Sequence, residues 1–243
     1  MPTRARTTSA KTDGAARFEG FADAGCTFFK QLAKNQDRDW FAKHKAEFQE
    51  GWERPMLSLL REAKTKLDGA YPDCDIAEPK VFRIHRDVRF SADKSPYKTH
   101  IGGALYVKIG QKGMTEVPAP LYVQLGTESF SGAGHYMMDA AQLAKFRASV
   151  VDEEKGGELA KIVAKLEKAG FVMGSHDELK KVPRGFDAEH PRASLLKKKG
   201  LVVTFPKLSS PKVIAERKFL DEVVTHAKAV APLVRWLTFH AST

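Results

Sequence analysis

Three stretches decide the fold: KVFRIHRDVRF (80–90), ALYVKI (104–109) and LYVQL (121–125). In each stretch apolar residues alternate with polar or aromatic ones, and this period of two places successive side chains of a β-strand on opposite faces. Pro118, Pro120 and a Lys112-Gly113 pair separate the second and third stretches. Turn residues in these positions favour antiparallel pairing, so the sequence predicts an antiparallel sheet that contains these three strands.

Apolar residues with helical spacing lie on both sides of this sheet region. Asn35 is a predicted N-cap for a helix through Trp40, and Pro55 predicts the end of that helix or a kink in it. After the sheet, Asp139 and Gln142 have the spacing of a capping box. Helical spacing then continues towards the C-terminus, interrupted by a short apolar strand over 201–205.

The chain contains no internal repeat and no flexible internal linker. Residues 18–243 are therefore predicted to form a single α+β domain, with a mainly antiparallel sheet of about four to six strands packed on one side by helices. Residues 1–17 are small, polar and basic, and they are predicted to be a disordered basic tail. The SFSGAG segment (129–134) has two interpretations, a glycine-kinked sheet edge or a backbone cradle for an anion, and we favour the first.

Composition limits the class of protein. The 243 residues of the chain include two cysteines without CxxC spacing, so neither a disulfide scaffold nor a zinc knuckle is predicted. No apolar run approaches membrane-spanning length, and no apolar segment follows the N-terminus as in a secretory signal. These features predict a cytoplasmic protein that does not enter a membrane.

The formal net charge of +10 is concentrated in a few segments. Residues 80–100 carry six Lys or Arg against two Asp, and residues 180–200 carry seven against two acids. If these segments meet in the fold, they make a positive surface suited to phosphates, nucleic acid or acidic metabolites. The alternative is two separate solvated patches that serve solubility.

The polar faces of the three strands and the turn after the first one supply candidate ligand-binding side chains. Arg86 is an exception, because it falls among apolar residues and needs a partner if it is buried, unless it extends to water. The predicted ligand-binding residues are Arg83, Arg86, Arg89, Lys94, Tyr97, Lys98, Tyr106, Tyr122, Gln124 and, from the second basic segment, Arg184.

Three functions fit this pattern. The first is a binding module for a phosphate-bearing ligand, with nucleic acid as one form, in which Tyr106 and Tyr122 stack on bases. The second is an enzyme for a small phosphorylated or carboxylated substrate, with His85 or Asp87 as the acid or base. The third is a non-catalytic interaction protein whose basic segments are solvated surface. No cofactor is predicted, and His85 with Asp87 supplies too few ligands for a metal site.

The stretch RIHRDVRFSADKSPYKTHIGG (83–103) resembles the family catalogued as domain of unknown function 2461. Three further stretches fit the same family in the same order: LAKNQDRDWFAKHKAEFQ (32–49), LYVQLGTESFSGAGHYMMDAAQLAKFR (121–147) and VPRGFDAEHPRASLLKKKGLVV (182–203). The chain departs from the family pattern at Ala133, Met137 and Met138, where a third glycine and an aromatic residue with a proline are typical. The resemblance implies that these segments belong together, and it implies no activity or cofactor.

Overall fold

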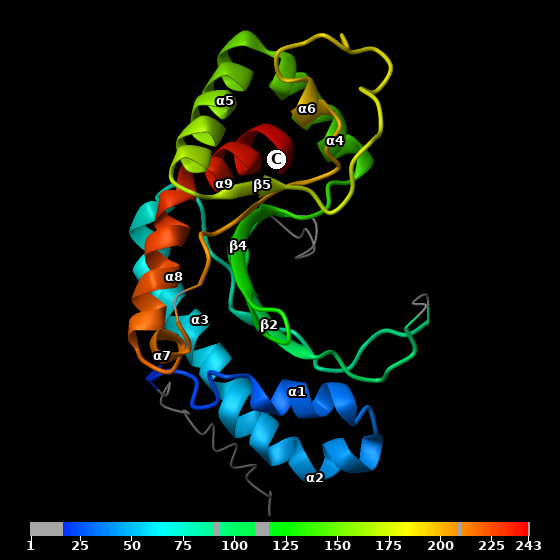
Figure 1. Cartoon of the computed structure of the whole chain (residues 1–243). Coiled ribbons are helices and arrows are strands. Elements are labelled where there is room, and N and C mark those ends of the chain that lie inside the picture. The colour runs from blue at the N-terminus through cyan, green and yellow to red at the C-terminus, as the bar shows by residue number, and fades with distance from the viewer. Residues whose placement is uncertain (1–16, 90–92, 110–116, 209, 243) are drawn as a thin grey trace, which may run out of the picture.

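A six-stranded antiparallel sheet lies at the centre of the computed structural model (Figure 1), which describes residues 17–89, 93–109, 117–208 and 210–242. The predicted tail, apart from Arg17, and the Lys112-Gly113 turn lie outside the described residues. In sheet order, the strands are β1 (Lys80–Val81), β2 (His100–Leu105), β3 (Ala119–Gly126), β4 (Phe130–His135), β6 (Leu201–Thr204) and β5 (Val172–Gly174). This arrangement confirms the predicted α+β fold with an antiparallel sheet.

Helices pack on one face of the sheet and extend beyond it at both ends (Figure 1). The face is covered by α3, α8 and α9, while α1 and α2 lie at one end and α4, α5 and α6 at the other. The α-helices are α1 (Thr27–Lys34), α2 (Arg38–Phe48), α3 (Arg54–Leu67), α4 (Ala140–Val151), α5 (Glu153–Lys168), α6 (Ala193–Leu196), α7 (Pro211–Ile214), α8 (Lys218–Ala229) and α9 (Ala231–Leu237). None of the helices in the described part of the chain has the length and apolarity needed to cross a bilayer.

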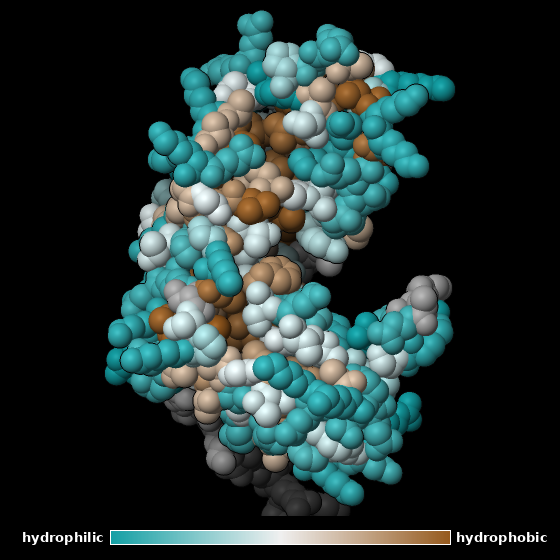
Figure 2. All heavy atoms as spheres, viewed as in Figure 1, coloured by the Kyte–Doolittle hydropathy of each residue, from teal (hydrophilic) through white to brown (hydrophobic). Residues whose placement is uncertain are grey.

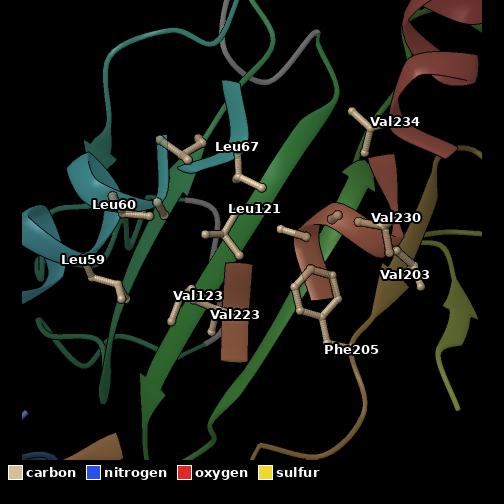
Figure 3. Close-up of a cluster of buried hydrophobic side chains, with 14 of the residues drawn as sticks. Leu59, Leu60, Leu67, Leu121, Val123, Val203, Phe205, Val223, Val230 and Val234 are labelled. Atoms are coloured by element: carbon tan, nitrogen blue, oxygen red, sulfur yellow. The ribbon is translucent and has the colours of Figure 1, made fainter. Parts of the chain in front are cut away.

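The main core lies between the sheet and these covering helices, and Figure 3 shows part of it. Leu121 and Val123 of β3 point towards Leu59 and Leu60 of α3 and towards Val223 of α8. All five side chains are fully buried. Each such side chain contributes roughly 1.5–3 kcal/mol by leaving water, so this layer fixes which face of the sheet is covered.

The first predicted strand is much shorter than its alternation suggests, because β1 ends at Val81 rather than at residue 90. Beyond Phe82 the chain pairs with the segment that follows it: Arg86 N donates to Pro96 O, and Lys98 N donates to Ile84 O. Pro96 has no N–H to donate, and the only bridge between the described residues of these two segments is that of His85 with Tyr97. Residues 82–89 and 93–99, called the arm below, therefore project from the sheet between β1 and β2 (Figure 1).

The second and fourth strands also differ from prediction. The second, β2, begins at His100 and ends at Leu105, so it lies earlier than the predicted 104–109. Residues 130–135 form β4, an interior strand between β3 and β6 rather than a sheet edge. Glycine permits this close pairing, because a Cβ on Gly132 would lie 2.6 Å from Val203 O.

The helical predictions need two corrections. Asp37 rather than Asn35 caps α2, and its carboxylate accepts hydrogen bonds from Asp39 N and Trp40 N. Pro55 neither ends nor breaks the helix, because it lies in the first turn of α3, where a proline is tolerated. A π-helical segment, η1 (Gln49–Glu53), connects α2 to α3. A 3-10 turn, η2 (Asp68–Ala70), follows α3, and a second π-helical segment, η4 (Thr238–Ser242), follows α9.

Candidate functional site

The face of the sheet opposite the covering helices contains a groove of about 550 Å3, called the sheet groove below. Figure 2 shows this side of the molecule hollowed between the α4–α6 end and the arm. The pairing of β3 with β4 places the side chains that face the groove on one surface. Tyr122 pairs with Gly132, and Gln124 pairs with Phe130. The side chains that line the groove are aromatic (Phe82, Tyr106, Tyr122, Phe130, Tyr136), polar (Lys98, His100, Gln124, Ser175, His176, Thr204) or aliphatic (Val117, Ala119, Ala133, Val202, Val203).

Three aromatic rings form a row across the groove. The centroid of Tyr122 lies 6.2 Å from that of Phe82 and 5.6 Å from that of Phe130. Gly102 lies on the same face and has no side chain that could cover the rings. A Cβ at this position would lie 3.0 Å from Tyr122 Oη. Phe130 is 38% exposed, which is unusual for a phenylalanine in an interior strand. The row therefore offers a planar ligand an accessible stacking surface.

A polar pair lies within the aromatic row. Tyr122 Oη donates a hydrogen bond of 2.8 Å to Gln124 Oε1, and Gln124 Nε2 donates to Glu128 O at 3.2 Å. Burial, followed by repulsion from Tyr106 and Tyr136, raises the pKa of Tyr122 to about 12. The hydroxyl is therefore neutral at physiological pH, and it remains a hydrogen-bond donor that orients the amide of Gln124.

Positive charge gathers where the arm enters the groove. Lys98 is partly buried, and its Nζ lies 5.9 Å from the centroid of Phe82. None of the ion pairs found among the described residues involves Lys98. Burial, and then the neighbouring charges of Arg83 and Arg86, lower the pKa of Lys98. An anion beside Lys98 would relieve this repulsion.

His100 lies next to this cationic end of the groove. Burial is the largest cause that lowers the pKa of His100, followed by the charges of Lys98 and Arg86. The imidazole is thus biased towards its neutral form, in which one ring nitrogen donates and the other accepts hydrogen bonds.

A second hollow, of about 470 Å3, lies between the arm and the start of α2 and is called the arm-base pocket below. The ring of Tyr97 stacks on that of Phe41 of α2, with a centroid distance of 4.4 Å. Tyr97 N also donates to Gln36 Oε1 at 3.0 Å, which ties the arm to the start of the helix. The lining residues are Arg38, His85, Arg86, Val88, Lys94, Pro96 and Tyr97.

The structure divides the predicted ligand-binding residues and the two acid–base candidates, His85 and Asp87, among three places. Lys98, Tyr106, Tyr122 and Gln124 line the sheet groove, and the predicted alternation of the strands places the last three on one face. Four others lie in the arm-base pocket: His85, Arg86, Lys94 and Tyr97. The remaining predicted residues line neither hollow: Arg83, Asp87, Arg89 and Arg184.

Asp87 and Arg89 form an exposed ion pair on the arm. Arg89 Nε and Nη2 donate to the two carboxylate oxygens of Asp87 at 3.0 and 2.8 Å. The hydrogen bonds from Arg89 lower the pKa of Asp87 to about 2. Asp87 is therefore ionised at neutral pH and has no proton to give as a general acid.

The second basic segment uses several of its cations internally. Lys199 Nζ pairs with Asp177 at 2.5 Å, and Lys198 pairs with Glu178. Arg192 Nε donates to Val150 O at 2.6 Å near the C-terminus of α4. The two lysine pairs hold residues 175–200 together, and Arg192 ties this region to α4. From this region only Ser175 and His176 line the groove.

Sequence reasoning missed several groove residues. Phe82 alternates with the polar residues of 80–90, and Phe130 belongs to the glycine-rich segment 129–134, so the sequence does not predict that either meets Tyr122. His176 lies after β5, and it enters the groove through contacts distant in sequence, with its ring 4.9 Å from that of Tyr136. A continued alternation through Phe130, Gly132 and Gly134 was the available signal for the fourth strand.

Within the described residues no cluster of three or more His, Cys, Asp or Glu side chains is arranged to hold a metal ion. Searches of curated proteins and of solved structures found no match to the chain. The family model of the conserved hypothetical protein DUF2461 matches residues 24–236, which include the sheet, the arm and both hollows. The chain therefore belongs to the DUF2461 family.

Proposed function

We propose that the sheet groove binds a nucleotide unit, either free or within a single-stranded nucleic acid. The observation that carries this proposal is Lys98, a partly buried cation without an ion pair among the described residues at the end of a row of aromatic rings. A phosphate beside Lys98 would compensate its charge, while a base lies over Tyr122.

The aromatic row supports the stacking part of this proposal. Every base has a flat face, and stacking on an aromatic side chain stabilises binding by about 1–3 kcal/mol per base. Phe82, Tyr122 and Phe130 come from neighbouring parts of one sheet, so a ligand can lie across them without a change in the backbone. Gln124 adds an amide at the same surface, where it can hydrogen-bond to the edge of a base.

The enzyme hypothesis has weaker support from the geometry. Its two proposed acid–base residues are separated, because His85 lines the arm-base pocket while Asp87 is held by Arg89. In the interaction-protein hypothesis the basic segments are solvated surface that binds no ligand. The ion pairs of Lys198 and Lys199 support this interpretation for the second basic segment. For the location, two free cysteines fit a protein of the reducing cytoplasm.

Fluorescence anisotropy with a labelled single-stranded oligonucleotide tests the groove, with a mononucleotide as the unlabelled competitor. Lys98→Gln removes the proposed phosphate contact and is expected to weaken binding about tenfold, the loss of one charged hydrogen bond. Lys161→Gln is the matched control, because it removes the same charge from an exposed position on α5. Competition by the mononucleotide would assign the site to a free nucleotide, and competition only by longer strands would assign it to nucleic acid.

Two results would contradict the proposal. One is the absence of binding by the unaltered protein to both the oligonucleotide and the mononucleotide at low salt, where phosphate contacts are strongest. The other is an equal loss of affinity in Lys98→Gln and Lys161→Gln, which would mean that overall charge rather than the groove attracts the ligand.

A further inference from the structure

We propose that the arm-base pocket is a separate anion site that takes a phosphate monoester group, independently of the sheet groove. Its lining contains three cationic side chains and an imidazole, and no carboxylate. The cations come from two directions, with Arg38 at the start of α2 and Arg86 and Lys94 on the arm. Cations held this close together repel one another unless an anion occupies the space between them.

Of two acids close in sequence, Asp93 compensates one of the three pocket cations, Arg86, and Asp37 is engaged elsewhere. Asp93 pairs with Arg86 Nη1 at 3.2 Å, and it also accepts hydrogen bonds from Ser95 N and Ser95 Oγ. Asp37 precedes Arg38 but caps α2 with its carboxylate. Arg38 and Lys94 take part in none of the ion pairs found among the described residues, so the pocket keeps a positive excess.

Arg86 has unused hydrogen-bonding capacity at this pocket. Its Nη1 faces Asp93 and its Nη2 makes only a long contact of 3.5 Å with Tyr97 O. Its Nε is buried and has no hydrogen-bond partner among the described atoms. A buried guanidinium N–H without an acceptor leaves Arg86 incompletely paired, and an oxyanion in the pocket would supply an acceptor to the same partly exposed side chain.

The walls of the pocket are held in place without a ligand. Tyr97 stacks on Phe41, its backbone N–H is bound by Gln36, and His85 pairs with Tyr97 across the arm. Binding therefore needs little ordering of these walls, which favours affinity for a small ligand.

The arrangement fits a phosphate better than a carboxylate. A tetrahedral phosphate presents three free oxygens in different directions, whereas a carboxylate presents two in one plane. The volume of about 470 Å3 leaves room for a group esterified to the phosphate. Tyr97 and Lys98 are consecutive, yet one lines this pocket and the other lines the groove, so the two sites can be altered separately.

The test is a titration of the full chain with inorganic phosphate at constant ionic strength, followed by 15N NMR of the arginine Nε–H groups. The Arg86 signal is assigned from the spectrum of Arg86→Lys. We expect a saturable shift of this signal below about 50 mM phosphate, and no comparable shift with acetate. The double variant Arg38→Gln, Lys94→Gln should weaken the response about tenfold or more, and Lys98→Gln, which removes a neighbouring charge outside the pocket, should weaken it by less than about twofold.

Arg38 and Lys94 are both exposed, so the double variant is expected to keep its fold, which its remaining arginine signals report. The proposal is overturned if Arg86 does not respond to phosphate, or if the double variant responds as the unaltered protein does. An equal shift with acetate would overturn the assignment to phosphate. Loss of the response in Lys98→Gln would overturn the separation of the two sites, whereas failure of the groove to bind a nucleotide would leave this site intact.

Discussion

The sheet groove and the arm-base pocket lie next to each other along the chain, yet they are built in opposite ways. The groove is formed mainly by regular strands, which place Tyr122 and Phe130 in a row with Phe82 at the base of the arm, and Lys98 is its cation. The pocket is formed by irregular backbone and the first residue of a helix, and cations dominate its lining. A strand face fixes a flat apolar surface, whereas a loop that folds back on itself brings together charges distant in sequence.

The largest effect is expected from a variant that removes a stacking ring and leaves the charges of the groove in place. Tyr122→Ala removes the central ring of the row, and we expect oligonucleotide affinity to fall about ten- to hundredfold, as for the loss of one stacked base. The phosphate response of Arg86 should be unchanged in this variant. Tyr122→Phe is the control, because it keeps the ring and removes only the hydroxyl bonded to Gln124. Equal losses in the two variants, measured by anisotropy, would show that the ring itself does not stack.

The next effect concerns the arm-base pocket alone. Arg86→Met keeps much of the side-chain bulk and removes the guanidinium, so the affinity for phosphate should fall about tenfold. The ion pair with Asp93 is partly exposed, because 30% of the Arg86 side chain and 54% of the Asp93 side chain are accessible. The free energy of unfolding, measured in urea, should therefore change by less than about 1 kcal/mol. Asp93→Asn serves as the control, since it breaks the same pair and leaves the guanidinium. A large loss of stability in Arg86→Met would identify Arg86 as a structural residue.

A change of pH is expected to have a smaller effect, and it acts on binding and on stability in opposite directions. At lower pH the oligonucleotide should bind more tightly, whereas the folded protein should be less stable. The lowered pKa of His100 means that the unfolded chain binds more protons than the folded chain below about pH 6.5, so stability falls as the pH falls through this range. A phosphate near Lys98 favours the protonated imidazole, so oligonucleotide affinity should rise about threefold from pH 8 to pH 6.

His100→Gln should flatten the pH profile of binding, measured by anisotropy at constant ionic strength. It should remove only part of the loss of stability, because burial also lowers the pKa of His226. An affinity that falls at lower pH in the unaltered protein would place the phosphate away from His100.

The smallest effect is expected on the exposed part of the arm. The sequence predicts a large loss of binding for Arg89→Ala, but the structure places Arg89 in an exposed pair with Asp87, outside the lining of both hollows. We therefore expect less than about a twofold change in oligonucleotide affinity and no measurable change in stability. A loss as large as that of Lys98→Gln would mean that the arm bends over the bound ligand.

Part of this comparison was predictable from the sequence. The alternation in LYVQL correctly placed Leu121 and Val123 in the core and Tyr122 and Gln124 on the opposite face. Periodicity succeeds here because a strand with one buried face has a strongly specified register.

The rest depended on contacts that periodicity does not contain. Residues 82–89 alternate like a strand, but the partner strand β2 begins only at His100, and Pro96 limits the pairing of the arm to one bridge. Glycines concealed β4, because their use in close pairing with β6 is visible only once Val203 is in place. Arg38 joins His85 through the packing of Phe41 on Tyr97, a contact between residues far apart in the chain.

Photocrosslinking tests most directly whether the aromatic row of the sheet groove is the surface that binds a nucleotide. A single-stranded oligonucleotide that carries 5-iodouridine is irradiated with the protein, and the crosslinked residues are mapped by mass spectrometry. We expect crosslinks at Tyr122 and Phe130, with their yield reduced in Lys98→Gln but not in Lys161→Gln. Crosslinks confined to the arm or to residues 1–16, with none in the groove, would contradict the central claim.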